Sequence, residues 1–214
     1  MKKTQKRKNE KGFTLIEMLV AMGVILVTMA AVSVLFSRAL GVRSRESSRT
    51  DALTSAQAAL NVMSREISNS GYGLSQNDYD TVHNNGIVLA DSNSTKLRIR
   101  CNVVNTNTTT SDVGEDVTYY YDSGAQSIVR HDPAQSPSTT YLVNQISSVT
   151  FQYYNYTGSN STPTITDTPT ENTSRVKITV TVKLGEVQGQ PTNRTVTLNS
   201  EVTLRNSDYM MSQY

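Results

Sequence analysis

Apolar residues are unevenly distributed along the chain, and the longest apolar run lies near the N-terminus. The nineteen residues from Met18 to Phe36 contain no charged side chain. As a helix, this run is roughly 28 Å long, close to the hydrocarbon core of a bilayer at about 30 Å. A secretory signal peptide has a shorter apolar region of about 7–15 residues, followed by a small-residue cleavage site. The run therefore predicts a membrane-spanning helix.

A second apolar pattern with helical spacing follows this run. Its members recur three and four residues apart, at Leu53, Ala56, Leu60, Met63 and Ile67. This spacing places them on one face of an amphipathic helix. The segment 69–73 contains two glycines, which are typical of a helix end. We expect this helix face to cover a hydrophobic core.

From residue 74 onward the composition shifts to Asn, Ser, Thr, Tyr and Val, and apolar residues alternate with polar ones. This alternation predicts strands over 87–89, 97–101, 117–121, 127–130, 146–156, 176–184 and 196–204. The clearest strand, 176–184, has polar residues on one face, which indicates an antiparallel sheet with that face in water. Its apolar face needs a cover, and the amphipathic helix can supply one. The predicted fold class is α+β.

Two polar segments interrupt the predicted strands. Residues 155–174 contain ten Ser or Thr and two prolines, which predicts an exposed, mobile loop between strands. Residues 102–111 predict a second polar loop.

The formal charge of +2 hides an asymmetry along the chain. Residues 1–12 carry a net +5, which leaves −3 for residues 13–214. A nucleic-acid-binding protein has its basic patch on the folded domain, so this distribution argues against that function. By the positive-inside rule, the basic tail is cytoplasmic and the rest of the chain lies across the membrane. Four further arginines, at 38, 43, 45 and 49, follow the run, so the excess of basic residues on the N-terminal side that sets this orientation is small.

Few residues in the sequence suggest a catalytic, disulfide or metal site. A single cysteine, Cys101, excludes an intramolecular disulfide and is expected to be a buried strand thiol. His83 and His131 are expected to be surface residues. Extracellular calcium sites use loop carboxylates, but solvated loop acids are the simpler interpretation of Asp78, Asp80 and Asp91. No catalytic motif is visible, so we expect neither an enzyme nor a metal or cofactor site.

Glu17 is the only charged residue between Lys11 and Arg38. A carboxylate in the centre of a membrane costs about 2.5–3.5 kcal/mol on insertion scales, which makes such a residue a candidate for a function. The alternative is that Glu17 lies at headgroup level in the first turn of the helix, where the helix dipole favours it.

The residues Lys11 to Glu17 (KGFTLIE), with the apolar run behind them, resemble the prepilin-type cleavage and methylation motif of type IV pilins and type II secretion pseudopilins. The resemblance implies that prepilin peptidase cuts between Gly12 and Phe13, and that Phe13 becomes the N-methylated first residue. It implies that Glu17 acts in assembly by pairing with the N-terminal amine of a neighbouring subunit. It also implies a lollipop fold, with one long N-terminal helix packed on an antiparallel β-sheet domain.

This resemblance divides the chain into four parts. Residues 1–12 form a cytoplasmic leader, 13–37 the membrane and filament-core half of the helix, 38–73 its amphipathic half outside the membrane, and 74–214 the globular domain. The implied location is the bacterial inner membrane, crossed once with a periplasmic C-terminal domain, and then a pilus or pseudopilus. The implied partners are other pilins or pseudopilins through the N-terminal helix, prepilin peptidase, the inner-membrane assembly platform, and membrane lipid before extraction.

A second resemblance concerns the end of the helix and the domain behind it. The segment 63–75 (MSREISNSGYGLS) is similar to the helix end of PilW-like minor pilins, and the expected strand order to PilW and pseudopilin J domains. The leading hypothesis is a minor pilin that acts in type IV pilus assembly, priming or tip formation. One alternative is a type II secretion pseudopilin, and a second is an uncleaved, membrane-anchored adhesin or sensor.

Overall fold

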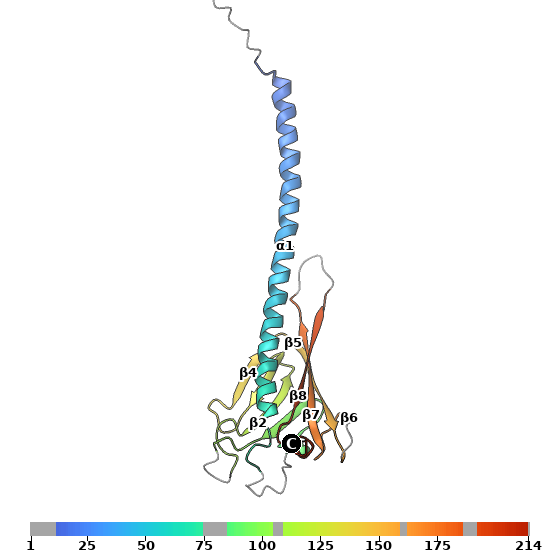
Figure 1. Cartoon of the computed structure of the whole chain (residues 1–214). Helices are drawn as coiled ribbons and strands as arrows, with labels where there is room; N and C mark the ends of the chain where they lie inside the picture. The colour runs from blue at the N-terminus through green and yellow to red at the C-terminus, as the bar shows by residue number, and fades with distance from the viewer. Residues whose placement is uncertain (1–11, 75–84, 105–108, 159–161, 186–191, 214) are drawn as a thin grey trace, which may run out of the picture. The chain divides into compact units, whose positions relative to one another are not determined.

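The structure is a computed structural model, and it describes residues 12–74, 85–104, 109–158, 162–185 and 192–213 (Figure 1). The chain divides into two compact units, Met1–Glu46 and Ser47–Tyr214. The first unit contains the beginning of helix α1, and the second contains the end of α1 and all the strands. The α+β fold class is confirmed, with a long apolar N-terminal helix followed by antiparallel sheets.

Helix α1 spans Leu15–Ser68 without interruption, so the membrane-spanning and amphipathic patterns belong to one helix of 54 residues. In the second unit one helix face is buried, at Ala52, Ala56, Ala59, Leu60, Met63 and Ile67. Leu53, a member of the predicted apolar face, is only partly buried. The buried face is therefore rotated slightly from the prediction and includes more alanine, whose small side chain lets a helix lie close to the residues it covers.

The two glycines predicted to end α1 do so. Gly71 and Gly73 have φ angles of 82° and 72°, in the left-handed region that glycine adopts without a steric penalty. Gly71 N donates to Arg100 O at 2.9 Å, which attaches the end of the helix to the end of a strand. Asn206 Nδ2 donates to Ser70 O at 2.9 Å and secures the same turn from the C-terminal side.

The strands form two four-stranded antiparallel sheets. The first has the order β1-β2-β3-β4, and its strands are Lys96–Arg100, Asp116–Asp122, Ser127–His131 and Thr139–Val143. The second has the order β6-β5-β7-β8, and in chain order its strands are Ile146–Asn155, Thr164–Thr166, Thr173–Lys183 and Thr195–Thr203. The predicted strand over 87–89 is wrong, because only Ile87 forms a bridge, with Ile99, and the 3-10 helix η2 begins at Leu89 (Leu89–Asp91).

The predicted alternation of β7 is confirmed. Val176, Ile178, Val180 and Val182 are fully buried, whereas the residues between them are partly exposed. These side chains belong to one core cluster with the buried face of α1 and with residues of both sheets, including Tyr119 and Phe151. In Figure 1 the second half of α1 lies along the strands, and Ser64 Oγ is 3.0 Å from Ser200 Oγ of β8. The helix therefore covers the sheets, as the pattern predicts.

The prediction of a mobile loop over 155–174 is wrong for part of that range. Residues Thr164–Thr166 form β6, which pairs with the end of β5, and β7 already begins at Thr173. Tyr156 is buried and stacks on Tyr209 of the C-terminal helix α2 (Asp208–Met211), with ring centroids 4.2 Å apart. Asn155 of β5 donates its Nδ2 to Thr166 Oγ1 at 2.9 Å and accepts from Thr173 Oγ1 at 2.6 Å, so side-chain hydrogen bonds help this Thr-rich segment to form an edge of the sheet.

Candidate functional site at the N-terminal motif

Gly12 and Phe13 lie just before α1, with Thr14 between Phe13 and the first helical residue, and both are exposed. A Cβ atom built on Gly12 would have no neighbour within 4 Å, and Phe13 is 85% exposed. The absence of a side chain on Gly12 leaves its backbone open to close approach by another protein. Among the described residues, nothing shields the predicted cleavage bond.

Glu17 lies in the first turn of α1 and is tied to Thr14. Glu17 Oε2 accepts hydrogen bonds from the backbone N and the Oγ1 of Thr14, both at 2.9 Å. In return, Glu17 N donates to Thr14 Oγ1 at 3.3 Å. This reciprocal pattern is a capping box, in which Thr14 is the N-cap and Glu17 the third helical residue.

The capping box gives Thr14 a role that the sequence analysis missed, although the signal was present. A Thr followed three residues later by Glu, just before an apolar run, is the signature of such a helix start. The box fixes the direction of the Glu17 carboxylate with two neutral donors. Within the described part of the chain, Oε1 accepts no hydrogen bond, so this oxygen can meet a further donor or a cation.

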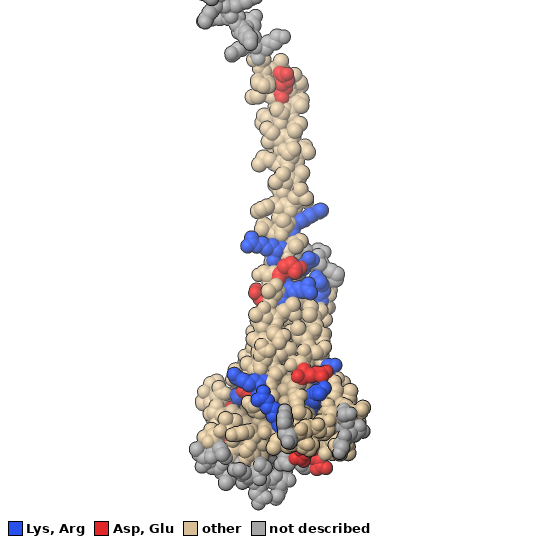
Figure 2. All heavy atoms as spheres, in the orientation of Figure 1, with Lys and Arg blue, Asp and Glu red and all other residues tan. Residues whose placement is uncertain are grey.

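The apolar run behind the motif stays fully accessible. Between Met18 and Phe36 every residue is exposed, with individual side chains such as Val27 and Leu35 about two-thirds accessible. Figure 2 shows this stretch of α1 without charged side chains, between the charges at its two ends. It is the one helix of the described chain that is long and apolar enough to cross a membrane. Such an apolar surface needs a lipid or protein environment.

The acidic residues considered for calcium do not form a visible site. Asp91 accepts a hydrogen bond from Arg98, which also binds Asp116, so the Asp91 carboxylate already has a cation. Asp78, Asp80 and His83 lie outside the described residues. Across the residues that are described, no group of three or more His, Cys, Asp or Glu side chains is placed to hold a metal ion.

The remaining two candidates have ordinary positions. Cys101 directly follows β1 and is buried, and its Sγ lies 3.4 Å from Gly114 O. Burial, reinforced by the nearby charges of Glu115 and Glu66, raises the pKa of its thiol to about 12. His131 is partly exposed at the end of β3, opposite Thr118 of β2.

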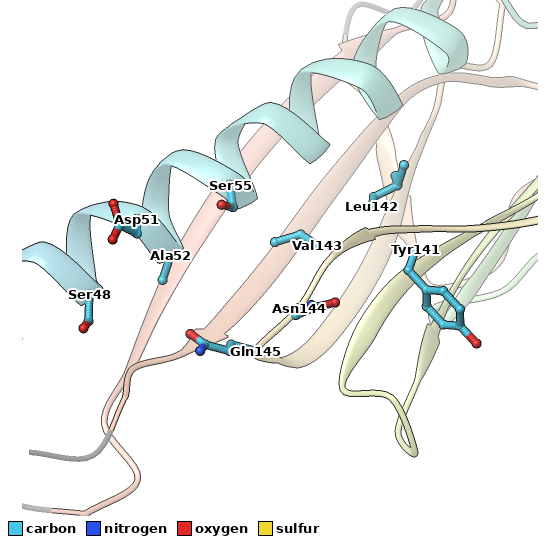
Figure 3. A pocket seen from close by; sticks show the side chains of 9 residues that line it. All are labelled: Ser48, Asp51, Ala52, Ser55, Tyr141, Leu142, Val143, Asn144 and Gln145. Atoms are coloured by element: carbon cyan, nitrogen blue, oxygen red, sulfur yellow. The ribbon is translucent and has the colours of Figure 1, made fainter.

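The second unit also has a shallow groove beside α1, shown in Figure 3. It has a volume of about 450 Å³ and is lined by helix residues, including Ser48, Asp51 and Ser55, and by the chain from Tyr141 to Gln145. Asp51 supplies its only carboxylate.

The comparisons with known proteins agree with the motif. The family model of the prokaryotic N-terminal methylation motif matches residues 7–33, a range that contains Gly12, Phe13, Glu17 and most of the apolar run. Among curated proteins and among solved structures, nothing matches the chain significantly.

The motif implies processing by prepilin peptidase and association with other pilins. Together with the exposed apolar helix, it is consistent with a single-pass anchor in the inner membrane. The matched segment and the helix that it begins support a type IV pilin-like protein.

Proposed function

We propose that this chain is a minor pilin, a structural and non-catalytic subunit that takes part in type IV pilus assembly, priming or tip formation. The observation that carries the proposal is the position of the methylation motif. It lies directly at the start of a continuous 54-residue helix, whose first part is exposed and free of charge from Met18 to Phe36. This apolar part of α1 can contact lipid before assembly and the helices of other subunits in the filament.

In this proposal the subunit first resides in the inner membrane. The basic leader 1–12 stays in the cytoplasm and the sheets lie in the periplasm. The capping box supports this state, because Thr14 donates two hydrogen bonds to one oxygen of the Glu17 carboxylate, Oε2, within its own helix turn. A polar group that is already hydrogen-bonded costs less to bring into an apolar environment than one without a partner.

Cleavage after Gly12 then creates a cation next to this carboxylate. The new α-amine of Phe13 has a reference pKa of about 7.7–8.0, so it is largely charged at neutral pH, and it stays so after one methylation. Glu17 Oε1 offers an acceptor to the amine of a neighbouring subunit. In a packed filament core of low dielectric, pairing the two charges is strongly preferred to leaving either alone.

The resemblance of segment 63–75 to PilW-like minor pilins is what favours a minor pilin over the alternatives. One alternative is a type II secretion pseudopilin, because such proteins have the same N-terminal motif. The other is an uncleaved anchor, which would keep residues 1–12. The processing and incorporation experiments distinguish these alternatives from a minor pilin.

The first test concerns processing. Expression together with an active prepilin peptidase should shorten the chain by residues 1–12, with N-methylation of Phe13, as intact-mass analysis can show. Gly12→Asp should block the cut, whereas Gly41→Asp, the same substitution outside the motif, should leave it unaffected. A full-length chain beside a peptidase that cleaves another prepilin would contradict the proposal and favour the uncleaved anchor.

The second test concerns incorporation. Glu17→Leu should leave cleavage and folding intact, but should remove the partner of a neighbouring Phe13 amine at a cost of about 3–5 kcal/mol. The subunit should then move from sheared filaments to the membrane fraction, whereas Glu201→Gln on the sheet surface should not change this ratio. Deletion of the chain should reduce piliation. A loss of type II secretion with normal piliation would assign the chain to a pseudopilus instead.

A further inference from the structure

The first sheet carries a buried valine on the side that faces away from α1. Val129 of β3 is fully buried, yet it does not belong to the core cluster that α1 covers. Its chain neighbour Arg130 donates a hydrogen bond to Glu66 of α1, so Val129 points to the opposite side of the sheet. A group other than α1 therefore shields this side chain from water.

Two tyrosines lie on either side of this valine. In the sheet register, Val129 is opposite Tyr120 of β2 and Tyr141 of β4. Cross-strand neighbours on one face of a sheet are close enough for aromatic rings to cover the side chain between them. Figure 3 shows the Tyr141 ring turned away from α1, and Tyr141 is 54% exposed. The two rings therefore lie over the outer face of the first sheet, where a ligand can contact them.

Two adjacent hollows surround Tyr120. The first has a volume of about 480 Å³, and its lining includes Arg98 of β1 and His131 of β3. The second has a volume of about 530 Å³, and its lining includes Ser148 of β5. Lys96 and Tyr120, which are opposite each other in β1 and β2, line both hollows. Each hollow has the volume of a small-molecule site, about 300–1,000 Å³.

Hydrogen bonds within the chain fix the charged side chains of the first hollow. Arg98 Nε and Nη2 donate to the two carboxylate oxygens of Asp116, at 2.8 and 2.7 Å, and Nη1 donates to Asp91 Oδ2 at 2.5 Å. Arg100 Nε donates to Asp116 Oδ2 at 3.0 Å. A guanidinium has five N–H groups, so within the described part of the chain Arg98 keeps two for a further acceptor. Because Arg98 is already held in place, a ligand that accepts these two hydrogen bonds loses little entropy in ordering it.

Three further side chains of the hollows have no partner among the described residues. They are Lys96, Tyr120 and His131, whose amine, hydroxyl and imidazole groups make no hydrogen bond or ion pair there. The two arginines balance the two carboxylates one for one, so the positive charge of Lys96 is left over. The hollows therefore offer one unbalanced cation, several hydrogen-bonding groups and an aromatic ring.

We propose that this outer face of the first sheet binds an acidic saccharide, a chain of sugar units that carries carboxylate groups. The carboxylate of one sugar unit pairs with Lys96 and accepts from the two remaining N–H groups of Arg98. The C–H groups on one face of the same sugar ring pack on Tyr120. The next sugar unit extends into the second hollow, where its hydroxyls meet that of Ser148.

The lining favours this ligand over simpler ones. A metal cation is disfavoured, because the carboxylates of the first hollow are already paired with arginines. A free inorganic anion would use the cations alone and leave the aromatic ring and the second hollow without a contact. A neutral sugar would leave the Lys96 charge unpaired. A nucleic acid needs an excess of several positive charges along its phosphates, and these hollows supply one.

Calorimetric titration of the full chain in detergent micelles can measure this binding. The probes are digalacturonic acid, sialyllactose and a hyaluronan tetrasaccharide, each beside its own methyl ester, in which the carboxylate charge is removed. We expect saturable binding of at least one of the acids, with its ester bound about tenfold more weakly, as for the loss of one hydrogen bond to a charged group. Acetate, which is a carboxylate without a sugar ring, should not displace the bound acid at equal concentration. This comparison uses the unaltered chain, so it does not depend on the folding of a variant.

Substitutions then test the two central side chains. Lys96→Gln should weaken binding of the acid by about tenfold and remove the preference for the acid over its ester. Tyr120→Leu keeps an apolar cover for Val129 but removes the ring, so it should weaken acid and ester alike, by about threefold or more. The matched controls are Lys177→Gln and Tyr154→Leu, the same changes at partly exposed positions of the second sheet, and they should leave binding unchanged.

The outcomes decide between this site and its alternatives. Absence of saturable binding for all three acids, or equal losses for Lys96→Gln and Lys177→Gln, would overturn the site. Equal binding of acid and ester, or displacement by acetate, would overturn the acidic saccharide as its ligand. A preference for the acid that only Lys96→Gln removes, with weaker binding in Tyr120→Leu, would establish both. The site lies wholly in the second unit and does not require cleavage after Gly12, so neither result bears on the proposed function.

Discussion

Arg130 is the centre of the polar network that joins α1 to the first sheet. Its Nε donates to Glu66 Oε2 of α1 at 3.0 Å, and its Nη1 donates to Asp132 Oδ2 at 3.2 Å and to Gln135 Oε1 at 2.9 Å. Tyr119 of β2 also donates its hydroxyl to Glu66. The Arg130 side chain is 10% exposed and that of Asp132 is fully buried. Replacing Arg130 therefore leaves two carboxylates without their cation in a nearly dry site.

The loss of stability that we expect from Arg130→Met depends on the hydrogen bonds that the two carboxylates keep in the variant. Breaking a buried ion pair from one side costs about 3–5 kcal/mol. Asp132 keeps two backbone donors, Gly114 N at 2.8 Å and Ala134 N at 3.1 Å, and Glu66 keeps the Tyr119 hydroxyl. We therefore expect a loss of about 3 kcal/mol in the free energy of unfolding, at the lower end of this range.

Urea unfolding of the fragment Ser47–Tyr214 can measure this loss, because the fragment corresponds to the second unit and omits the apolar run. Urea is uncharged, so it does not screen the ion pairs. With m values of about 1–3 kcal/mol/M, the midpoint should fall by roughly 1–3 M. The control is Arg175→Met, which breaks a 3.5 Å pair with Glu201 whose side chains are 39% and 47% exposed, and should cost under about 1 kcal/mol. Equal losses for the two variants would refute the assignment of Arg130 to a desolvated network.

Three further predictions concern the same unit. Gly86→Ala should cost about 2 kcal/mol or more in urea unfolding, because Gly86 has a φ of 74° and an added Cβ would lie 2.5 Å from Arg100 O. Cys101, whose pKa burial raises to about 12, should react with a thiol reagent at pH 8 only on unfolding; rapid labelling of the native fragment would argue against its buried position. Burial alone would raise the pKa of Asp116, but Arg98 and Arg100 lower it overall. Because the pKa of Asp116 is lower in the folded chain, its ionised form stabilises the fold fully above the pKa of an unfolded Asp, about 4. This stabilisation should be lost as the pH falls below that value, and Asp116→Asn should remove this part of the pH dependence of the free energy of unfolding.

The sequence predicted the elements whose periodicity arises from burial. Helix α1 and strand β7 pack one face against a broad core, so their apolar residues recur with periods of 3.6 and 2. Strand β4 has no such signal, because it is an edge strand with its residues mostly part-exposed. Strand β6 is three residues long and pairs only with β5. Its existence depends on hydrogen bonds to the end of β5, the preceding strand, and its own three residues are too few to show an alternation.

The candidate site shows the same division between local and distant information. Gly12, Phe13 and Glu17 could be found because the motif is contiguous, and the Thr14 capping box was visible in it as well. The Glu66–Arg130 pair joins residues 64 positions apart, and no spacing rule connects them. The division of the strands into two sheets is equally non-local, because β5 follows β4 closely in the chain but pairs with β6 and β7 instead of β4.

Burial separates the charges of this chain into two groups with different consequences. Glu66 and Arg130 neutralise one another inside the second unit, and so do Arg98 and Asp116, so we expect substitutions there to change stability. The charges of α1 in the first unit are at least partly exposed, and none of the residues of that unit that the structure describes is buried. Substitutions there should leave the sheets folded and change what the helix binds. Glu17 has a local role in the capping box with Thr14, which uses its Oε2, and we expect its other oxygen, Oε1, to be the atom that meets a second chain.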